Sequence, residues 1–190
     1  MKGQVLDGVA PHMKDYFRVD KTQEPVDVAD VLKKSKADVL INYLPVGSEE
    51  AVRWYASQTI EAGCGFINCI PVFIASDMQW AGKFKKAGLP IIGDDIKSLV
   101  GATIVHRTLT QMIIDRGAKI DSTYQLNVGG NTDFRNMMDQ SRLRSKKISK
   151  TESVASQIPY DAYVYAGPNG CIDSLNDNKI CHLKIDFRLF

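Results

Sequence analysis

The sequence predicts an α/β protein in which part of a doubly wound parallel sheet is followed by an α+β domain. Two observations support this fold class. Short apolar runs without polar alternation recur about every 25 residues in the first half, with segments of helical length between them. After about Thr103 the pattern changes, and a strand with alternating side chains follows. A length of 190 residues suits one full domain or two small ones.

The first half has a regular order of strand and helix. Ser48 is typical of a helix N-cap, and Gly63 is typical of a helix end. Short apolar strands of this kind are expected to be buried on both faces, and ligands of such sheets bind outside the carboxyl ends of the strands. We expect strands at residues 38–43, 66–70 and 89–92, helices at 48–62, 76–87 and 98–116, and a ligand edge at 42–48, 68–76 and 93–98.

The second half mixes the two element types in another order. In the strand expected at residues 119–127, Tyr124 and Leu126 alternate with Gln125 and Asn127. A polar turn at 128–133, a short helix at 131–140, a basic stretch at 141–150 and strands at 161–165 and 180–190 follow. The chain therefore divides into a partial Rossmann-like domain, residues 1–103, and an α+β domain, residues 104–190.

Composition excludes several classes of protein. Lysine and arginine number 24 against 22 acidic residues, so the net charge of +2 gives no general basis for binding nucleic acid. The longest apolar run is too short and too interrupted to span a membrane, and the first residues do not lead into a signal-peptide core. The four cysteines form no Cys-x-x-Cys pair, which favours reduced thiols in a cytoplasmic protein. The three histidines share no metal-ligand spacing, so no metal site is expected.

Two polar clusters are candidate binding sites. Asp94, Asp95 and Ser98 lie between a buried strand and a helix start, where they suit sugar hydroxyls or phosphate; a loop that merely caps the helix is the alternative. Asn127, Asn131 and Asp133 surround two glycines. These residue types are common in turns for backbone reasons alone, but amides that converge on one place also suit a polyol.

The basic stretch holds a lysine pair. Such a run is most often a solvated face. Lys146 and Lys150, four residues apart, share one face if the segment is helical, and their mutual repulsion would lower their pKa values or attract an anion. That arrangement suits a phosphorylated or enolising substrate. Taken alone, Lys179 is interpreted as a turn residue and His106 as a structural histidine of an apolar helix.

Five segments together resemble the myo-inositol-1-phosphate synthase family, in its bacterial and archaeal branch. The resemblance runs in order over nearly the whole chain. The segments are Asn42-Tyr-Leu-Pro-Val-Gly47, Phe66-Ile-Asn-Cys-Ile-Pro-Val-Phe73, Gly93-Asp-Asp-Ile-Lys-Ser98 with Gly101-Ala-Thr103, Leu126-Asn-Val-Gly-Gly-Asn-Thr-Asp-Phe134, and Ser145-Lys-Lys-Ile-Ser-Lys150.

The resemblance implies an isomerase that converts glucose 6-phosphate to inositol phosphate with bound NAD, by oxidation, enolisation, aldol closure and re-reduction. Residues 1–103 would then be the later part of the NAD-binding domain, and 104–190 the catalytic and tetramerisation domain. By motif position it implies catalytic roles for Lys146, Lys150, Lys179 and Asp95, substrate binding by Ser98, Asn127, Asn131 and Asp133, and NAD contact by Asn42, Gly47 and Asp94.

The family's glycine-rich pyrophosphate turn and a further lysine-bearing segment have no counterpart in these residues. We therefore expect a fragment of a longer product that, alone, binds NAD weakly and shows no turnover. Two alternatives stay open. One is another two-domain NAD(P)-dependent dehydrogenase, which would accumulate NADH; the other is a non-catalytic module that binds sugar phosphates without NAD.

Overall fold

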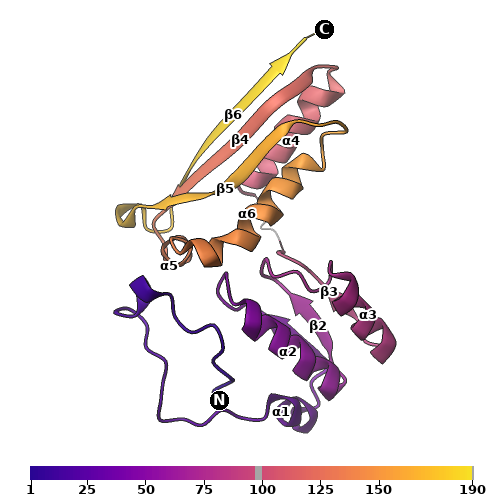
Figure 1. Cartoon of the computed structure of the whole chain (residues 1–190), viewed down its shortest axis with the longest axis vertical. Coiled ribbons are helices and arrows are strands. Elements are labelled where there is room, and N and C mark those ends of the chain that lie inside the picture. The colour runs from indigo at the N-terminus through magenta and orange to yellow at the C-terminus, as the bar shows by residue number, and fades with distance from the viewer. Residues whose placement is uncertain (97–99, 190) are drawn as a thin grey trace. The chain divides into compact units, whose positions relative to one another are not determined.

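The chain folds into two compact units, Met1–Ile96 and Lys97–Phe190, each with its own sheet. The computed structural model describes residues 1–96 and 100–189. Figure 1 shows the first unit in indigo to magenta and the second in salmon to yellow. The pattern change that the sequence places at Thr103 falls just inside the first helix of the second unit, which begins at Ala102.

The first unit is a three-stranded parallel sheet with helices between the strands. The strand order is β1-β2-β3, and Asn42 of β1 lies in register with Asn68 of β2. A helix at residues 28–35, capped by Asp27, precedes the repeating pattern and is not among the elements expected from the sequence. The elements are η1 (Pro11–Met13), α1 (Val28–Ser35), β1 (Val39–Asn42), α2 (Glu49–Ala62), β2 (Gly65–Asn68), α3 (Met78–Ala87) and β3 (Ile91–Ile92).

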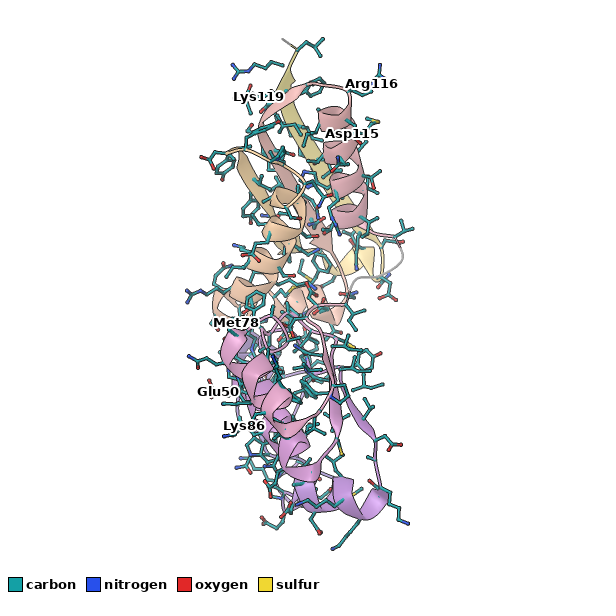
Figure 2. The ribbon with its side chains drawn as sticks, turned by 90° about the vertical axis from the view of Figure 1, so that its right-hand side faces the viewer. Glu50, Met78, Lys86, Asp115, Arg116 and Lys119 are labelled. Carbon is teal, nitrogen blue, oxygen red and sulfur yellow. The ribbon has the colours of Figure 1, made fainter. Side chains whose placement is uncertain are left out.

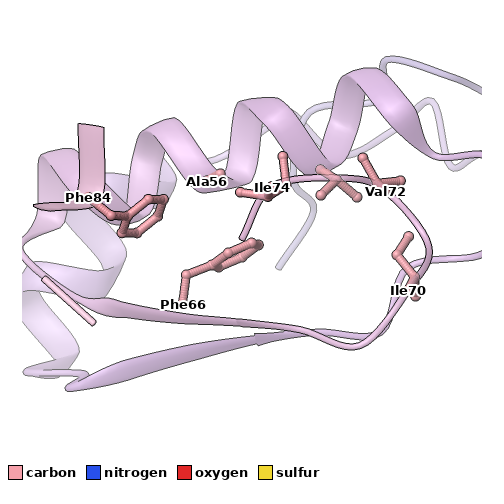
Figure 3. Packing of buried hydrophobic residues seen from close by; sticks show 7 residues of the cluster. Ala56, Phe66, Ile70, Val72, Ile74 and Phe84 are labelled. Carbon is pink, nitrogen blue, oxygen red and sulfur yellow. The ribbon is translucent and has the colours of Figure 1, made fainter. Parts of the chain in front are cut away.

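The core of the first unit lies between one face of this sheet and two helices. Phe66 of β2 stacks on Phe84 of α3, with 6.1 Å between their ring centroids. Figure 3 shows these rings beside Ala56 of α2 and the apolar side chains of the loop after β2. On the other face Val39 and Ile41 are exposed. Burial of both faces, expected from the sequence, is therefore not seen, because α2 and α3 pack against the same face.

The second unit is a mixed sheet whose central strand is β4. It pairs in parallel with β5 and antiparallel with β6. Helices α4 and α6 lie on one face of the sheet, as Figure 1 shows. The basic stretch is helical, so the condition attached to its lysine pair is met. The elements are α4 (Ala102–Asp115), β4 (Lys119–Gly129), α5 (Thr132–Asn136), α6 (Gln140–Ala155), β5 (Tyr163–Cys171), η2 (Asp173–Leu175) and β6 (Lys179–Arg188).

The polar side of β4 faces the helices. Thr123 and Gln125 have no exposed surface and Asn127 is buried, whereas Tyr124 and Leu126 on the opposite side are only half-buried. Successive side chains of a strand point to opposite faces, so this inversion places a polar ladder under α4 and α6. A buried polar group is costly unless it is hydrogen-bonded, and the partners of this ladder define the second unit's site.

Local sequence explains where the helices begin and end. Gly63 and Gly88 end α2 and α3 in the left-handed conformation that glycine adopts without steric cost. Asp77 caps α3 by accepting hydrogen bonds from two amides of its first turn. Figure 2 labels Asp115, Arg116 and Lys119, which flank the tight turn from α4 into β4. Within the described ranges, no helix has the length and apolar character needed to cross a membrane.

Candidate functional site

The carboxyl ends of the first unit's strands are joined by a chain of polar side chains. The amide nitrogen of Asn42 donates to Asn68 Oδ1 at 2.7 Å, and Asn68 Nδ2 donates to Asp94 Oδ1 at 2.7 Å. Asn42 and Asn68 end β1 and β2, and Asp94 comes shortly after β3. The edge where ligands of parallel sheets bind is therefore tied together by side chains from all three strands.

Asp94 organises the loop that follows β2. Its carboxylate accepts from the backbone amides of Ile74 at 2.9 Å, Ala75 at 3.1 Å and Ser76 at 3.1 Å, and from the Ser76 hydroxyl at 2.7 Å. With Asn68, both carboxylate oxygens are engaged by the protein's own chain. Asp94 therefore shapes this edge of the sheet.

The other predicted residues of the first unit lie at the same edge. Asp95 is buried, has a left-handed backbone (φ 53°), and donates its backbone N–H to the Ile70 carbonyl at 3.1 Å. Gly47, with φ 86°, makes the turn before α2. Ser98 lies outside the described residues. Sequence reasoning missed Asn68 as a site residue; its signal is an amide that interrupts an apolar strand at its carboxyl end.

This edge meets some of the requirements of a dinucleotide site and not others. The amides of Glu50 and Ala51 at the N-terminus of α2 donate to the carboxylate of Asp7 at 3.0 and 2.8 Å, so they are not available to a pyrophosphate. The turn at Gly47 and the loop held by Asp94 present backbone at the carboxyl ends of parallel strands, which is where such cofactors bind. The backbone of these turns is therefore placed where a dinucleotide could bind, whereas the first turn of α2 is occupied by Asp7.

In the second unit, the lysine pair lies on α6. Lys146 and Lys150 are one helical turn apart and both are half-buried. Lys150 Nζ donates to Thr103 Oγ1 at 3.3 Å, in the first turn of α4. Burial raises the pKa of the Cys181 thiol while the positive charge of Lys150 opposes that rise, so the ammonium group lies near β6 as well.

Thr103 connects Lys150 to the buried polar ladder of β4. Gln125 Nε2 lies 3.5 Å from Thr103 Oγ1 and donates to Asn127 Oδ1 at 3.0 Å. Asn127 Nδ2 donates to the Gly167 carbonyl of β5 at 2.9 Å. The structure thus joins Lys150 and Asn127, two predicted site residues, through Thr103 and Gln125. Sequence reasoning assigned Gln125 no role, because a glutamine within a strand carries no signal of its own.

The predicted residues at the far end of β4 are grouped around Phe134. Asn131 caps α5 by accepting the Phe134 amide at 3.2 Å, and Lys179, the first residue of β6, places Nζ 5.6 Å from the centroid of the Phe134 ring. Asp133 is exposed in the first turn of α5. Gly130 is required here, since a Cβ would lie 2.5 Å from both Asn176 N and Ile172 O. Of the two lysine-bearing elements, β6 pairs with β4 along the whole strand and brings Lys179 opposite Gly129, whereas α6 packs mainly on β5.

Metal binding finds no support in this arrangement. Among residues 1–96 and 100–189, no three histidine, cysteine, aspartate or glutamate side chains gather closely enough to hold an ion. His106 is fully buried against β4, and burial lowers the pKa of its imidazole.

A family model described as myo-inositol-1-phosphate synthase matches residues 101–190. The whole chain is 50% identical, over 198 residues, to the inositol-3-phosphate synthase of Corynebacterium glutamicum, and covers 54% of that protein. It is also 50% identical, over 196 residues, to the inositol-3-phosphate synthase of Mycolicibacterium smegmatis, again covering all of this chain and 54% of that one. The chain spans about half the length of the curated relatives that it matches.

Solved structures share the fold. A myo-inositol-1-phosphate synthase-related protein from Thermotoga maritima matches 84% of this chain and 49% of its own, with a TM-score of 0.65 and 25% identity. Inositol-3-phosphate synthase from Caenorhabditis elegans matches 98% of this chain and 47% of its own, with a TM-score of 0.63 and 16% identity, which shows the fold alone. The α/β fold class expected from the sequence is confirmed.

Proposed function

The chain is related along its whole length to the myo-inositol-1-phosphate synthase family, and from this premise we propose that it carries part of the site of an NAD-dependent isomerase that converts glucose 6-phosphate to inositol phosphate. The single observation that carries this proposal is the half-buried lysine pair of α6, with Lys150 hydrogen-bonded to Thr103 at the start of α4. This arrangement places positive charge beside a helix N-terminus, where both favour an anion.

The lysine pair suits both the phosphate group and the sugar oxygens of the substrate. A sugar phosphate brings a dianion, which Lys150 and the first turn of α4 would bind. Oxidation, enolisation and aldol closure each develop negative charge on a sugar oxygen, and fixed ammonium groups stabilise such charge strongly away from water. We assign Lys146 to the oxygen that is first oxidised and Lys150 to proton transfer and phosphate contact. Lys179, at the Phe134 end of the site, would be a third cationic group.

The amides of the site have mainly an orienting role. Both side-chain atoms of Asn127 are engaged, one by Gln125 and one by the Gly167 carbonyl. Asn127 therefore fixes the wall of the sugar pocket, and Asn131 fixes the start of α5. Asp133 and Ser98 complete the proposed substrate set, and we assign Asp95 to the catalytic set.

NAD, when bound, supplies a hydride acceptor and later a hydride donor. We propose that Asn42, Gly47 and Asp94 serve it through the backbone of the loops that they shape. Asn42 Oδ1 accepts the Leu44 amide at 3.0 Å, which holds the chain as it leaves β1. Residues 1–96 would then be the later part of the NAD-binding domain and the second unit the catalytic domain.

The second sheet also offers a surface for assembly. The face turned away from α4 and α6 carries half-buried Tyr124 and Leu126, with exposed Tyr163 and Ile180 on the flanking strands. An apolar sheet face of this kind is suited to burial against another subunit. We propose a homotetramer formed through this face, in the cytoplasm.

The test is binding and turnover. The purified protein is incubated with glucose 6-phosphate and NAD, and the phosphorus NMR spectrum is followed. The proposal expects saturable binding of glucose 6-phosphate that is weakened in Lys150→Met and, because this chain carries only part of the site, neither inositol phosphate nor accumulated NADH. NADH that accumulates with the substrate consumed would instead identify a dehydrogenase. Binding of glucose 6-phosphate that needs no NAD and survives Lys150→Met would identify a non-catalytic binding module.

A further inference from the structure

A small pocket of the second unit is lined by α5, the first half of α6 and the end of β5. Figure 1 shows these elements together, and both helices contact β5. The pocket has a volume of about 150 Å³. Sites for small organic molecules usually measure ~300–1,000 Å³, so this pocket suits a small ion and not a sugar phosphate.

The pocket and the proposed sugar-phosphate site use different faces of α6. Gln140, Leu143 and Lys147 line the pocket, and their spacing of three and four residues places them on one face of the helix. Lys146 and Lys150 share another face, from which Lys150 donates to the first turn of α4. The proposed function therefore leaves Lys147, a lysine of the same basic stretch, without a role.

Lys147 supplies an uncompensated positive charge. Of the described side chains that line the pocket, Lys147 alone is charged, and none is acidic. It is half-buried, and within residues 1–96 and 100–189 its ammonium group makes no hydrogen bond or ion pair; Nζ lies 5.9 Å from the centroid of the Tyr165 ring. Gly167 permits this position, since a Cβ there would lie 3.2 Å from Lys147 Cγ. A cation that has lost part of its hydration without gaining a carboxylate favours an anion beside it.

Asn169 adds an amide donor from β5. Its Oδ1 accepts the backbone N–H of Asn127 at 3.2 Å, and its Nδ2 donates to the Tyr165 hydroxyl at 3.1 Å. A backbone N–H can only donate, so the orientation of this amide is fixed. Nδ2 carries two N–H groups, and within the described ranges one of them is used. Lys147 and Asn169 both adjoin Tyr165 and both line the pocket, so their donors converge there.

We propose that this pocket binds a small oxyanion such as inorganic phosphate, held by the Lys147 ammonium group and the Asn169 amide. Hydrogen bonds from a charged donor to an oxyanion are about twice as strong as neutral ones. The site is separate from the one around Lys150 and does not depend on the proposed function. Because Asn169 also accepts the Asn127 amide, an anion in the pocket is coupled to the strand that lines the proposed sugar pocket.

The test is a titration of the whole chain with inorganic phosphate at neutral pH. NMR follows the Lys147 ε-methylene and the Asn169 side-chain amide, which report the pocket, and the Asn127 backbone amide, which reports the coupling to β4. Sodium chloride at matched ionic strength separates binding from general screening. Urea unfolding of each variant checks that a loss of binding does not follow a loss of stability.

Four variants locate the anion. Lys147→Met removes the charge and keeps an unbranched apolar side chain. Arg144→Met removes a charge at an exposed position of the same helix and is the matched control. Asn169→Asp keeps an acceptor for the Asn127 amide but places a negative charge at the pocket. Lys150→Met tests whether the pocket and the proposed sugar-phosphate site are separate.

We expect saturable shifts at all three reporters in the parent protein. Lys147→Met should weaken phosphate binding at Asn169 by about tenfold or more, the effect of one charged hydrogen bond. Asn169→Asp should abolish the binding, whereas Arg144→Met and Lys150→Met should leave it within about twofold of the parent.

Three outcomes would overturn the proposal. Shifts that sodium chloride reproduces would show screening and no site. A loss in Arg144→Met or Lys150→Met as large as that in Lys147→Met would show that the pocket is not the binding site. An Asn127 amide that stays unmoved while Asn169 responds would refute the coupling. The proposed function is tested separately, by the response of Lys150 to glucose 6-phosphate.

Discussion

Asp94 offers the sharpest test of how the first unit's ligand edge is held. The substitution Asp94→Asn keeps the size of the side chain but replaces one acceptor oxygen by a donor nitrogen. In the native protein Oδ1 accepts from Asn68 and the Ala75 amide, and Oδ2 accepts from the Ile74 amide and twice from Ser76. Whichever oxygen is replaced, the new nitrogen faces donors.

The magnitude follows from these contacts. If the nitrogen takes the place of Oδ1, two hydrogen bonds are lost; at Oδ2, two are lost even if the Ser76 hydroxyl rotates to accept. Hydrogen bonds to a charged group are each worth ~1.5–3 kcal/mol, so the free energy of unfolding should fall by about 3–6 kcal/mol. That is a large part of the stability of a small domain.

Tryptophan fluorescence during urea unfolding measures this loss, because both tryptophans of the chain, Trp54 and Trp80, lie in α2 and α3 of the first unit. Asp77→Asn is the matched control. It makes the same change of charge at the α3 cap, where asparagine caps as well as aspartate, and should change the stability by less than ~0.5 kcal/mol. Asp94→Asn removes two hydrogen bonds to a charged group. If it lowers the free energy of unfolding by less than ~1 kcal/mol, Asp94 does not hold the loop at this edge of the sheet.

Three further predictions concern the second unit. Gly130→Ala should prevent the turn after β4 from closing, because its Cβ would lie 2.5 Å from two backbone atoms. In the control Gly170→Ala, the Cβ meets only Val128 methyl groups at 3.8 and 3.9 Å. Circular dichroism melts should show a large loss of stability for Gly130→Ala alone. Burial lowers the folded-state pKa of His106, so the unfolded chain binds more protons between the two pKa values. Stability should be full above about pH 6.5 and fall as the pH decreases toward the folded pKa, and His106→Asn should flatten this fall in melts recorded across that window. Thr123→Val leaves the Lys184 carbonyl without its donor and His106 Nε2 without its hydrogen-bond partner, and should cost ~1–3 kcal/mol in urea unfolding, while Thr108→Val, at an exposed hydroxyl, should cost far less.

Much of the fold could be predicted because its signals are local. The order of the β1–α2–β2–α3–β3 elements follows from apolar runs, capping residues and the glycines that end α2 and α3. Their bounds agree with the sequence to within a few residues. The helix at 28–35 was missed although Asp27 caps it, because no apolar strand precedes it to set the pattern.

The site could be predicted only where sequence spacing determines geometry. Four residues on a helix place Lys146 and Lys150 on one face, and the structure keeps them there. Hydrogen bonds between distant segments have no such signal. Gln125 looks like an ordinary strand residue, and Asn68 is marked only as an amide at the carboxyl end of an apolar strand. The importance of both follows from partners that lie on other elements. The alternation in β4 located two faces correctly but could not say that the polar face is the buried one.

The central claim is that Lys150, held by Thr103, binds a sugar phosphate. Titration of the protein with glucose 6-phosphate, followed by NMR at Thr103 and at the Lys150 ε-methylene, tests it most directly, with Lys147 as the control because its Nζ lies toward the Tyr165 ring at 5.9 Å. The account predicts saturable shifts at both positions, binding weakened by about tenfold or more in Lys150→Met, and binding close to that of the parent in Lys147→Met. Equal weakening in the two variants, or shifts that inorganic phosphate and glucose 6-phosphate cause only elsewhere in the chain, would contradict it.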